Sequence, residues 1–134
     1  MSIWLAGCAW TYPRTEPSEA MALGVGTLED RYRKVRAAEI RGDDWEQQRD
    51  LLRAEAARRL LSMEVITDAE ADLIVSGRIS RGMPLAGVWW AWGPPWTEDS
   101  NRSPYGHVVT WKWTSGKQTV TFRDGEVQWW NIID

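Results

Sequence analysis

Apolar and charged positions in the first half of the chain follow the spacing of helices. Between positions 27 and 42 the apolar residues recur every three or four residues, with charged residues between them. This pattern predicts a helix that ends at Gly42. An Ala- and Leu-rich stretch with one apolar stripe predicts a second helix over about 44–63. Asp43 and Glu46 have the spacing of a capping box at its start.

Two shorter helices are predicted in the middle of the chain. Thr67 and Glu70 again have the capping-box spacing, and they open a helix that Gly77 closes. The next helix covers 85–92. Pro84 suits the first turn of a helix, and the Gly-Pro-Pro sequence after position 92 cannot continue one.

The C-terminal part alternates between apolar and polar residues as β-strands do. Val109, Trp111 and Trp113 share one face of the first predicted strand. The stretch before it, 96–106, is dense in Ser, Asn, Asp and Pro, so it is predicted to be a loop.

The last two predicted strands form a hairpin. The strand over 118–123 places Val120 and Phe122 on one face. An Asp-Gly pair follows, and it is a strong signal for a two-residue turn because both residues tolerate a positive φ. The strand over 126–132 then returns with Trp129 on the side of Phe122.

These elements predict an α+β fold with N-terminal helices, followed by two short helices packed on a three-stranded antiparallel meander. Residues 1–26 are expected to be a flexible N-terminal arm or tether, because they hold scattered Pro and Gly residues. Residues 27–66 form a helical segment. Residues 67–134 form a helix-plus-sheet module that we expect to bind a partner.

Composition narrows the classes of function. The chain has 134 residues and a formal net charge of −3, and its basic residues alternate with acidic ones, which argues against a nucleic-acid partner. A single cysteine and a single histidine leave no cysteine-cluster metal site and little for zinc, so we expect no metal or cofactor. No apolar run is long enough to span a bilayer.

No pattern in the sequence proposes an enzyme. The chain has neither a Gly-x-Ser-x-Gly elbow nor a phosphate-cradling loop, and His107 has no carboxylate placed to orient it. Its paired carboxylates fall at helix starts, where they cap free N–H groups.

Tryptophan is the compositional anomaly, with 11 residues against three tyrosines and one phenylalanine. Trp111, Trp113 and Trp129 follow the apolar face of the strands, so they are expected in the core, and Trp92 is expected to be packed. Helical and strand geometry forces others away from that face. They lie either in an exposed interface or under the N-terminal helices. The candidate partner-binding residues are Trp89, Trp90, Trp96 and Trp130, with Arg102 and Tyr105 on the neighbouring loop.

Residues 5–8 near the N-terminus are Leu-Ala-Gly-Cys. This sequence resembles a bacterial lipobox in which Cys8 would be the lipidated residue. No Lys or Arg and no apolar region of the length of a signal peptide precedes Cys8, so the alternative is an ordinary cysteine in a loose arm.

A set of short motifs in the second half falls in a familiar order: Gly82-Met83, Val88, Trp92-Gly93-Pro94-Pro95, Asn101-Arg102-Ser103, Trp111-Lys112-Trp113 and the run from Thr119 to Val127. Over about 79–128 the chain resembles the small outer-membrane-assembly lipoprotein domain (SmpA/OmlA), whose fold is shared with β-lactamase inhibitor proteins. The resemblance implies two short helices followed by a three-stranded meander, and lipidation at an N-terminal cysteine, here Cys8.

The expected function is therefore a non-enzymatic cell-envelope protein, a lipoprotein held at the outer membrane that binds another envelope protein. Two alternatives stay open. One is an intracellular inhibitor or small-ligand-binding domain with Cys8 unmodified, which would place the chain in the cytoplasm. The other is a binder of carbohydrate or peptidoglycan, which the many indole rings would suit.

Overall fold

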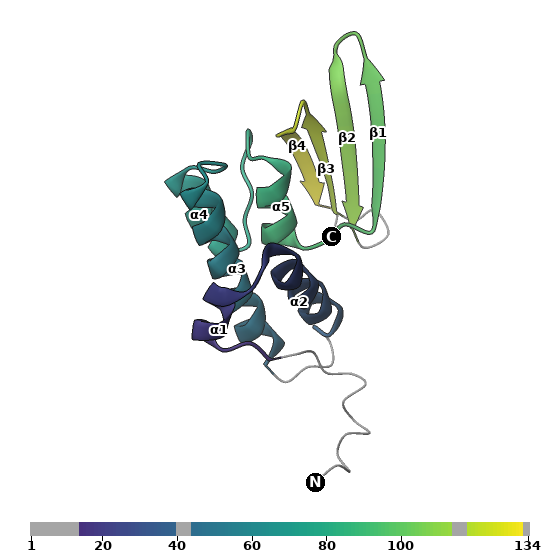
Figure 1. Ribbon diagram of the computed structural model, residues 1–134. Coiled ribbons are helices and arrows are strands. Elements are labelled where there is room, and N and C mark those ends of the chain that lie inside the picture. The colour runs from purple at the N-terminus through teal and green to yellow at the C-terminus, as the bar shows by residue number, and fades with distance from the viewer. Residues whose placement is uncertain (1–13, 40–43, 114–117, 133–134) are drawn as a thin grey trace.

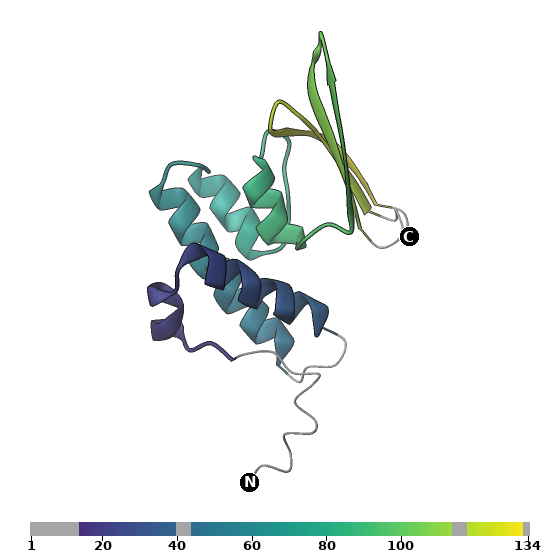
Figure 2. The same cartoon turned by 45° about the vertical axis from the view of Figure 1, so that its right-hand side comes forward.

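A computed structural model describes residues 14–39, 44–113 and 118–132. Five helices precede the sheet along the chain (Figure 1): α1 (Pro17–Ala22), α2 (Val25–Ala37), α3 (Trp45–Ser62), α4 (Asp68–Val75) and α5 (Leu85–Trp92). All five lie to one side of the sheet, and no described element covers its other face (Figure 2).

The sheet has four antiparallel strands in the order β1-β2-β3-β4: β1 (Thr97–Ser103), β2 (Gly106–Trp113), β3 (Gln118–Arg123) and β4 (Glu126–Ile132). The α+β class is confirmed, but the expectation of three strands and of a loop over 96–106 is wrong. The supposed loop forms β1, which pairs along its whole length with β2. Every residue of β1 is exposed, so the strand carries no apolar alternation by which it could be recognised.

Two local features that the sequence predicted, a helix capping box and a tight turn, are present in the structure. Thr67 Oγ1 accepts a hydrogen bond from the backbone N–H of Glu70, and Glu70 bonds back to the N–H of Thr67, so this capping box is confirmed. The turn between β3 and β4 has positive φ at both Asp124 and Gly125, as predicted. The helix that was predicted to end at Gly42 ends earlier, at Ala37, and the N-cap residue of α3 is Asp44 and not Asp43. The turn predicted over 114–117 lies outside the described residues.

Part of the expected N-terminal arm is packed against the helices. Helix α1 lies within it, and Thr15, which precedes α1, is buried. The backbone N–H of Thr15 donates to Gln48 Oε1 of α3 (2.8 Å), and Gln48 Nε2 donates to the Thr15 carbonyl (3.2 Å). From residue 14 onward the arm is therefore part of the helical layer, so the expectation of flexibility up to residue 26 is wrong.

The C-terminal end of α5 is held by a buried arginine of α3. Arg53 is 4% exposed, and its Nε and Nη2 donate to the carbonyls of Trp90 (3.1 Å) and Ala91 (2.8 Å). The hydroxyl of Tyr32 from α2 also donates to the Trp90 carbonyl. A cation at this end of a helix satisfies carbonyls that lack an intrahelical partner and complements the helix dipole.

Glu55 on α3 is buried and forms ion pairs with two arginines of the same helix, of which Arg58 is exposed. Its Oε2 accepts hydrogen bonds from Arg58 Nη2 (2.7 Å) and from Arg59 Nε (2.7 Å). The bond from Arg58 lowers the pKa of Glu55 most, burial opposes it, and Arg59 lowers the pKa further, so that it stays below its ordinary value. Arg59 also donates to the carbonyls of Ala20 and Leu23, which ties α1 to α3.

A lowered carboxyl pKa makes the stability pH-dependent in a defined direction. Glu55→Gln is expected to lower the free energy of unfolding near pH 7, and the difference from the original protein should shrink toward zero as the pH falls through the lowered pKa of Glu55. Urea denaturation at a series of pH values measures this. A difference that stays constant down to acid pH would contradict the ionic role of Glu55.

Candidate binding cleft at the junction of helices and sheet

The predicted partner-binding residues lie in four separate places. Trp89 and Trp90 belong to α5, Trp96 immediately precedes β1, and Trp130 lies on the edge strand β4. Arg102 and Tyr105 are exposed at the far end of the β1–β2 hairpin, at the opposite end of β1 from Trp96. The sequence therefore predicted several exposed side chains, but the structure does not bring them together into one site.

Of the two alternatives left open for Trp90, burial under the N-terminal helices holds, because this side chain is only 5% exposed, and it is therefore not accessible as a partner-binding residue. Its ring packs at 4.5 Å from that of Tyr32 and at 4.9 Å from that of Trp89, which is itself half-buried against the core. The reason is that α5 packs against other helices as well as facing the sheet. The apolar character of α5 on all sides is the sequence signal for this, since a helix apolar all round is buried.

The expectation of a buried Trp129 is wrong, because this side chain is 64% exposed. Phe122 pairs with Val127 but Thr121 pairs with Trp129, so β4 has one extra residue, Gln128, at a β-bulge. The bulge shifts the alternation by one position and moves Trp129 to the face of Thr121, away from the helices. Trp111 and Trp113, in contrast, are buried as predicted.

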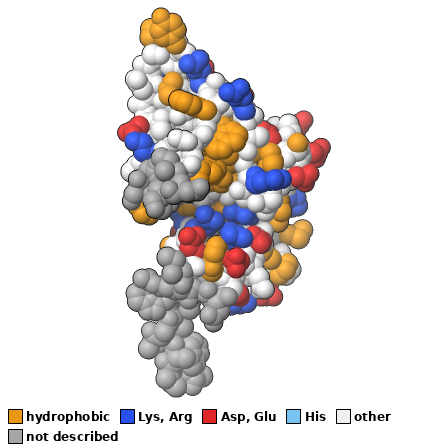
Figure 3. Space-filling view, turned by 180° about the vertical axis from the view of Figure 1, so that it is seen from behind, with side chains coloured by type: hydrophobic (Ala, Val, Ile, Leu, Met, Phe, Trp, Pro, Cys, Tyr) orange, Lys and Arg blue, Asp and Glu red, His pale blue; other side chains and the backbone are white. Residues whose placement is uncertain are grey.

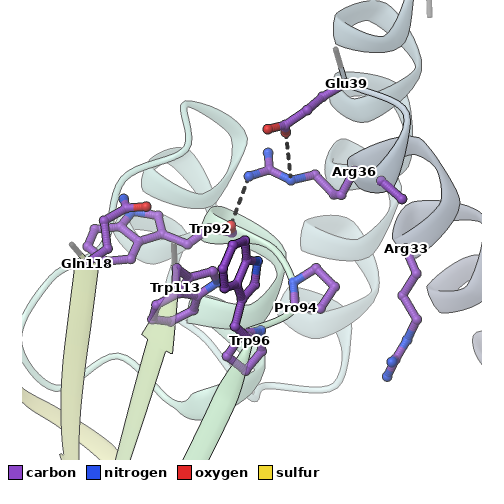
Figure 4. A pocket seen from close by; sticks show the side chains of 10 residues that line it. Arg33, Arg36, Glu39, Trp92, Pro94, Trp96, Trp113 and Gln118 are labelled. Carbon is purple, nitrogen blue, oxygen red and sulfur yellow. Dashed lines mark hydrogen bonds and ion pairs between the residues drawn. The ribbon is translucent and has the colours of Figure 1, made fainter. Parts of the chain in front are cut away.

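A cleft of about 330 Å³ lies where the end of α2 meets the α5–β1 connection and the sheet. We call it the waist cleft. It is lined by Arg33, Arg36, Ala37, Glu39, Trp92, Pro94, Pro95, Trp96, Trp113 and Gln118. Figure 4 shows three indole rings grouped on one side and the Arg36–Glu39 pair on the other. Figure 3 shows hydrophobic side chains gathered between the sheet and the helices, with Lys and Arg side chains next to them.

The aromatic wall of the waist cleft is firmly positioned. Trp92 and Trp113 pack edge to face with their ring centroids 5.4 Å apart, and Trp113 Nε1 donates to the Gly93 carbonyl (3.1 Å). The backbone N–H of Trp96 donates to the Lys112 carbonyl (2.8 Å), which fixes the residue at the start of the sheet. The Trp96 side chain is nevertheless 68% exposed, so it presents a large accessible apolar surface at the rim of the waist cleft.

The cationic wall comes from one face of α2, since Arg33 and Arg36 are three residues apart. Arg36 is fixed, because its Nη2 donates to the Trp92 carbonyl (2.9 Å) and its Nε lies 3.8 Å from Glu39 Oε2. Arg33 is different. It stacks 5.2 Å from the Trp89 ring centroid, and no carboxylate of the described residues pairs with it.

The two arginines were not among the residues predicted to bind. Their charges alternate with acidic residues along the helix, which is typical of a solvated face. Only the packing of α2 beside the tryptophans distinguishes them from the other arginines. Their spacing shows that they share a face, but it does not show what that face meets.

A serine–histidine pair is the closest approach to catalytic chemistry. Ser100 Oγ lies 2.6 Å from His107 Nε2 on the exposed β1–β2 hairpin. Asp124 accepts a hydrogen bond from the backbone N–H of His107, not from its ring. Among the described residues no carboxylate bonds to the ring, so the pair lacks the orienting member of a catalytic triad.

Neither a metal centre nor a membrane-spanning helix is found in the described ranges. No group of three or more His, Cys, Asp or Glu side chains in them is placed to hold a metal ion. None of the helices in that part of the chain is long and apolar enough to cross a membrane. Comparisons of the chain with protein-family models, with curated proteins and with solved structures each give no match.

Proposed function

We propose that this chain is a non-enzymatic binding protein that takes a segment of a protein partner into the waist cleft. The single observation that carries the proposal is that one cleft is lined both by the exposed Trp96 and by Arg33, whose guanidinium has no carboxylate partner among the described residues. Trp and Arg are the residue types most enriched at the energetic centres of protein interfaces.

The chemistry of the cleft defines the segment that would fit. Arg33 offers a planar guanidinium suited to a carboxylate, either an Asp or Glu side chain or a chain terminus. The Trp96 ring and Pro94 beside it offer apolar surface, so the residue next to that carboxylate would be apolar or aromatic. A volume of about 330 Å³ fits side chains of a short segment and not a whole domain.

A peptide library displayed on phage tests the proposal directly. Selection on the protein should enrich segments in which an acidic residue neighbours an apolar or aromatic one. Enrichment of sequences without an acidic residue, or equal binding of the enriched peptides to a protein with Arg33→Glu and Trp96→Ala, would overturn the assignment to this cleft.

The cellular setting is proposed from the lipobox-like Leu-Ala-Gly-Cys and from the resemblance to the outer-membrane-assembly lipoproteins. In this proposal the chain is held in the cell envelope by a lipid on Cys8, and the partner is another envelope protein. Cys8 lies outside the described residues. Mass spectrometry of the membrane-derived protein should find a diacylglyceryl-modified Cys8 at the mature N-terminus, and an unmodified Cys8 would remove this part of the proposal.

A further inference from the structure

The two edges of the sheet differ in chemistry. The edge strand β1 is polar and exposed throughout, and its charged side chains include Glu98, Asp99 and Arg102. Charged side chains on an edge discourage another strand from pairing with it. The other edge, β4, exposes three large apolar side chains, with Trp129 at 64%, Trp130 at 41% and Ile132 at 53%. Only the β4 edge is therefore suited to receive a strand.

The first half of the β4 edge is already occupied. The backbone N–H of Gly82 donates to the Val127 carbonyl (2.8 Å), and the N–H of Val127 donates to the Met83 carbonyl (2.9 Å). Arg81 Nε donates to the Gln128 carbonyl (3.0 Å). No described segment pairs with the outer side of Trp129–Ile132, so the free part of the edge coincides with its apolar part.

The β-bulge distributes the side chains of this free stretch over both faces. Trp130 pairs with Val120 and Ile132 with Gln118, so both lie on the face that the helices cover elsewhere. Trp129 and Asn131 pair with Thr121 and Thr119 and lie on the opposite face. Trp130 and Ile132 therefore lie two positions apart on one face, and the polar Asn131 lies between them on the other face. When the strand is reversed about Asn131, Trp130 comes opposite Ile132 and Ile132 comes opposite Trp130, so the pattern is complementary to itself.

We infer that a second copy of this chain pairs its β4 antiparallel to this β4, about a two-fold axis at Asn131. This register places Trp130 of each copy opposite Ile132 of the other on the same face, twice in the interface. The free stretch Trp129–Ile132 carries no charge, so reversing it against itself brings no like charges together. The two four-stranded sheets would become one continuous eight-stranded sheet.

Introducing a charge at Asn131, on the two-fold axis, tests this register. Asn131 is exposed and faces away from the helices, so substitutions there should leave the monomer folded. Asn131→Lys puts two ammonium groups opposite each other, and Asn131→Glu puts two carboxylates there. Each variant alone should dimerise roughly five- to ten-fold more weakly than the original protein. An equimolar mixture should recover the dimer, because Lys then faces Glu.

Sedimentation velocity over a concentration series measures the dimer, and near-ultraviolet circular dichroism confirms that each variant is folded. A wholly monomeric original protein would overturn the inference. So would single variants that dimerise as well as the original protein, because their interface would lie elsewhere. A mixture that fails to recover would exclude pairing about Asn131. None of these outcomes depends on whether the waist cleft binds a peptide.

Discussion

Replacing Arg53 by methionine is expected to lower the free energy of unfolding by about 2–4 kcal/mol. The substitution keeps the apolar length of the side chain but removes every donor that it offers. The Ala91 carbonyl loses its hydrogen bond, and the Trp90 carbonyl keeps only that from Tyr32. A buried carbonyl without a donor costs more than the bond itself contributes, because water cannot replace it.

Two control variants separate this role from simple loss of charge. Asp50 lies 3.8 Å from Arg53 and is half-exposed, so Asp50→Asn should cost less than about 0.5 kcal/mol. Lys34→Met removes an exposed cation that pairs with Asp30 and should cost equally little. Urea denaturation monitored by tryptophan fluorescence measures all three. If Arg53→Met matched the controls, the arginine would not be holding the end of α5.

Changing either Arg33 to Glu or Trp96 to Ala should weaken binding of a selected acidic peptide by about 30-fold or more, which corresponds to about 2 kcal/mol. Glu at position 33 repels the carboxylate that Arg33 would hold, and Ala at position 96 removes the apolar platform. Neither change should lower stability by more than about 1 kcal/mol, because both side chains are exposed and Arg33 loses only its stacking on the Trp89 ring.

The matched control lies at the other end of the same strand. Arg102→Glu with Tyr105→Ala makes the same kinds of change, a charge reversal and loss of an exposed aromatic ring, at the far tip of the β1–β2 hairpin. Peptide affinity, measured by isothermal titration calorimetry, should be unchanged in this variant. Equal losses at both ends of β1 would point to a nonspecific effect of surface charge and aromatic area rather than to the cleft.

Elements that depend on local chemistry could be predicted from the sequence, and those that depend on register could not. The capping box of α4 and the Asp-Gly turn are each specified by two residues and are present in the structure. Trp129 was misassigned because the extra residue Gln128 in β4 reverses the alternation after it. A bulge without a glycine leaves no composition signal, since the partner strand determines which residue is extra.

The waist cleft was predicted only in part, for a related reason. Exposed Trp96 follows from its position after a helix stop, where no periodic pattern assigns it to a buried face. Arg33 and Arg36 become binding candidates only because α2, some 60 residues earlier in the chain, packs next to the α5–β1 connection. The buried Arg53 was missed for the same reason, since its partners are carbonyls and carry no side-chain signature.

The carbonyls at the end of α5 have a consequence for how this chain can be divided. Donors on α2 (Tyr32 and Arg36) and on α3 (Arg53) converge on three successive carbonyls of α5. The backbone amides of α5 should therefore exchange with solvent only through openings that also release α2 and α3. A fragment containing only the stretch that resembles the lipoprotein domain would lack all three donors, so transplanting it would require carrying the two earlier helices with it.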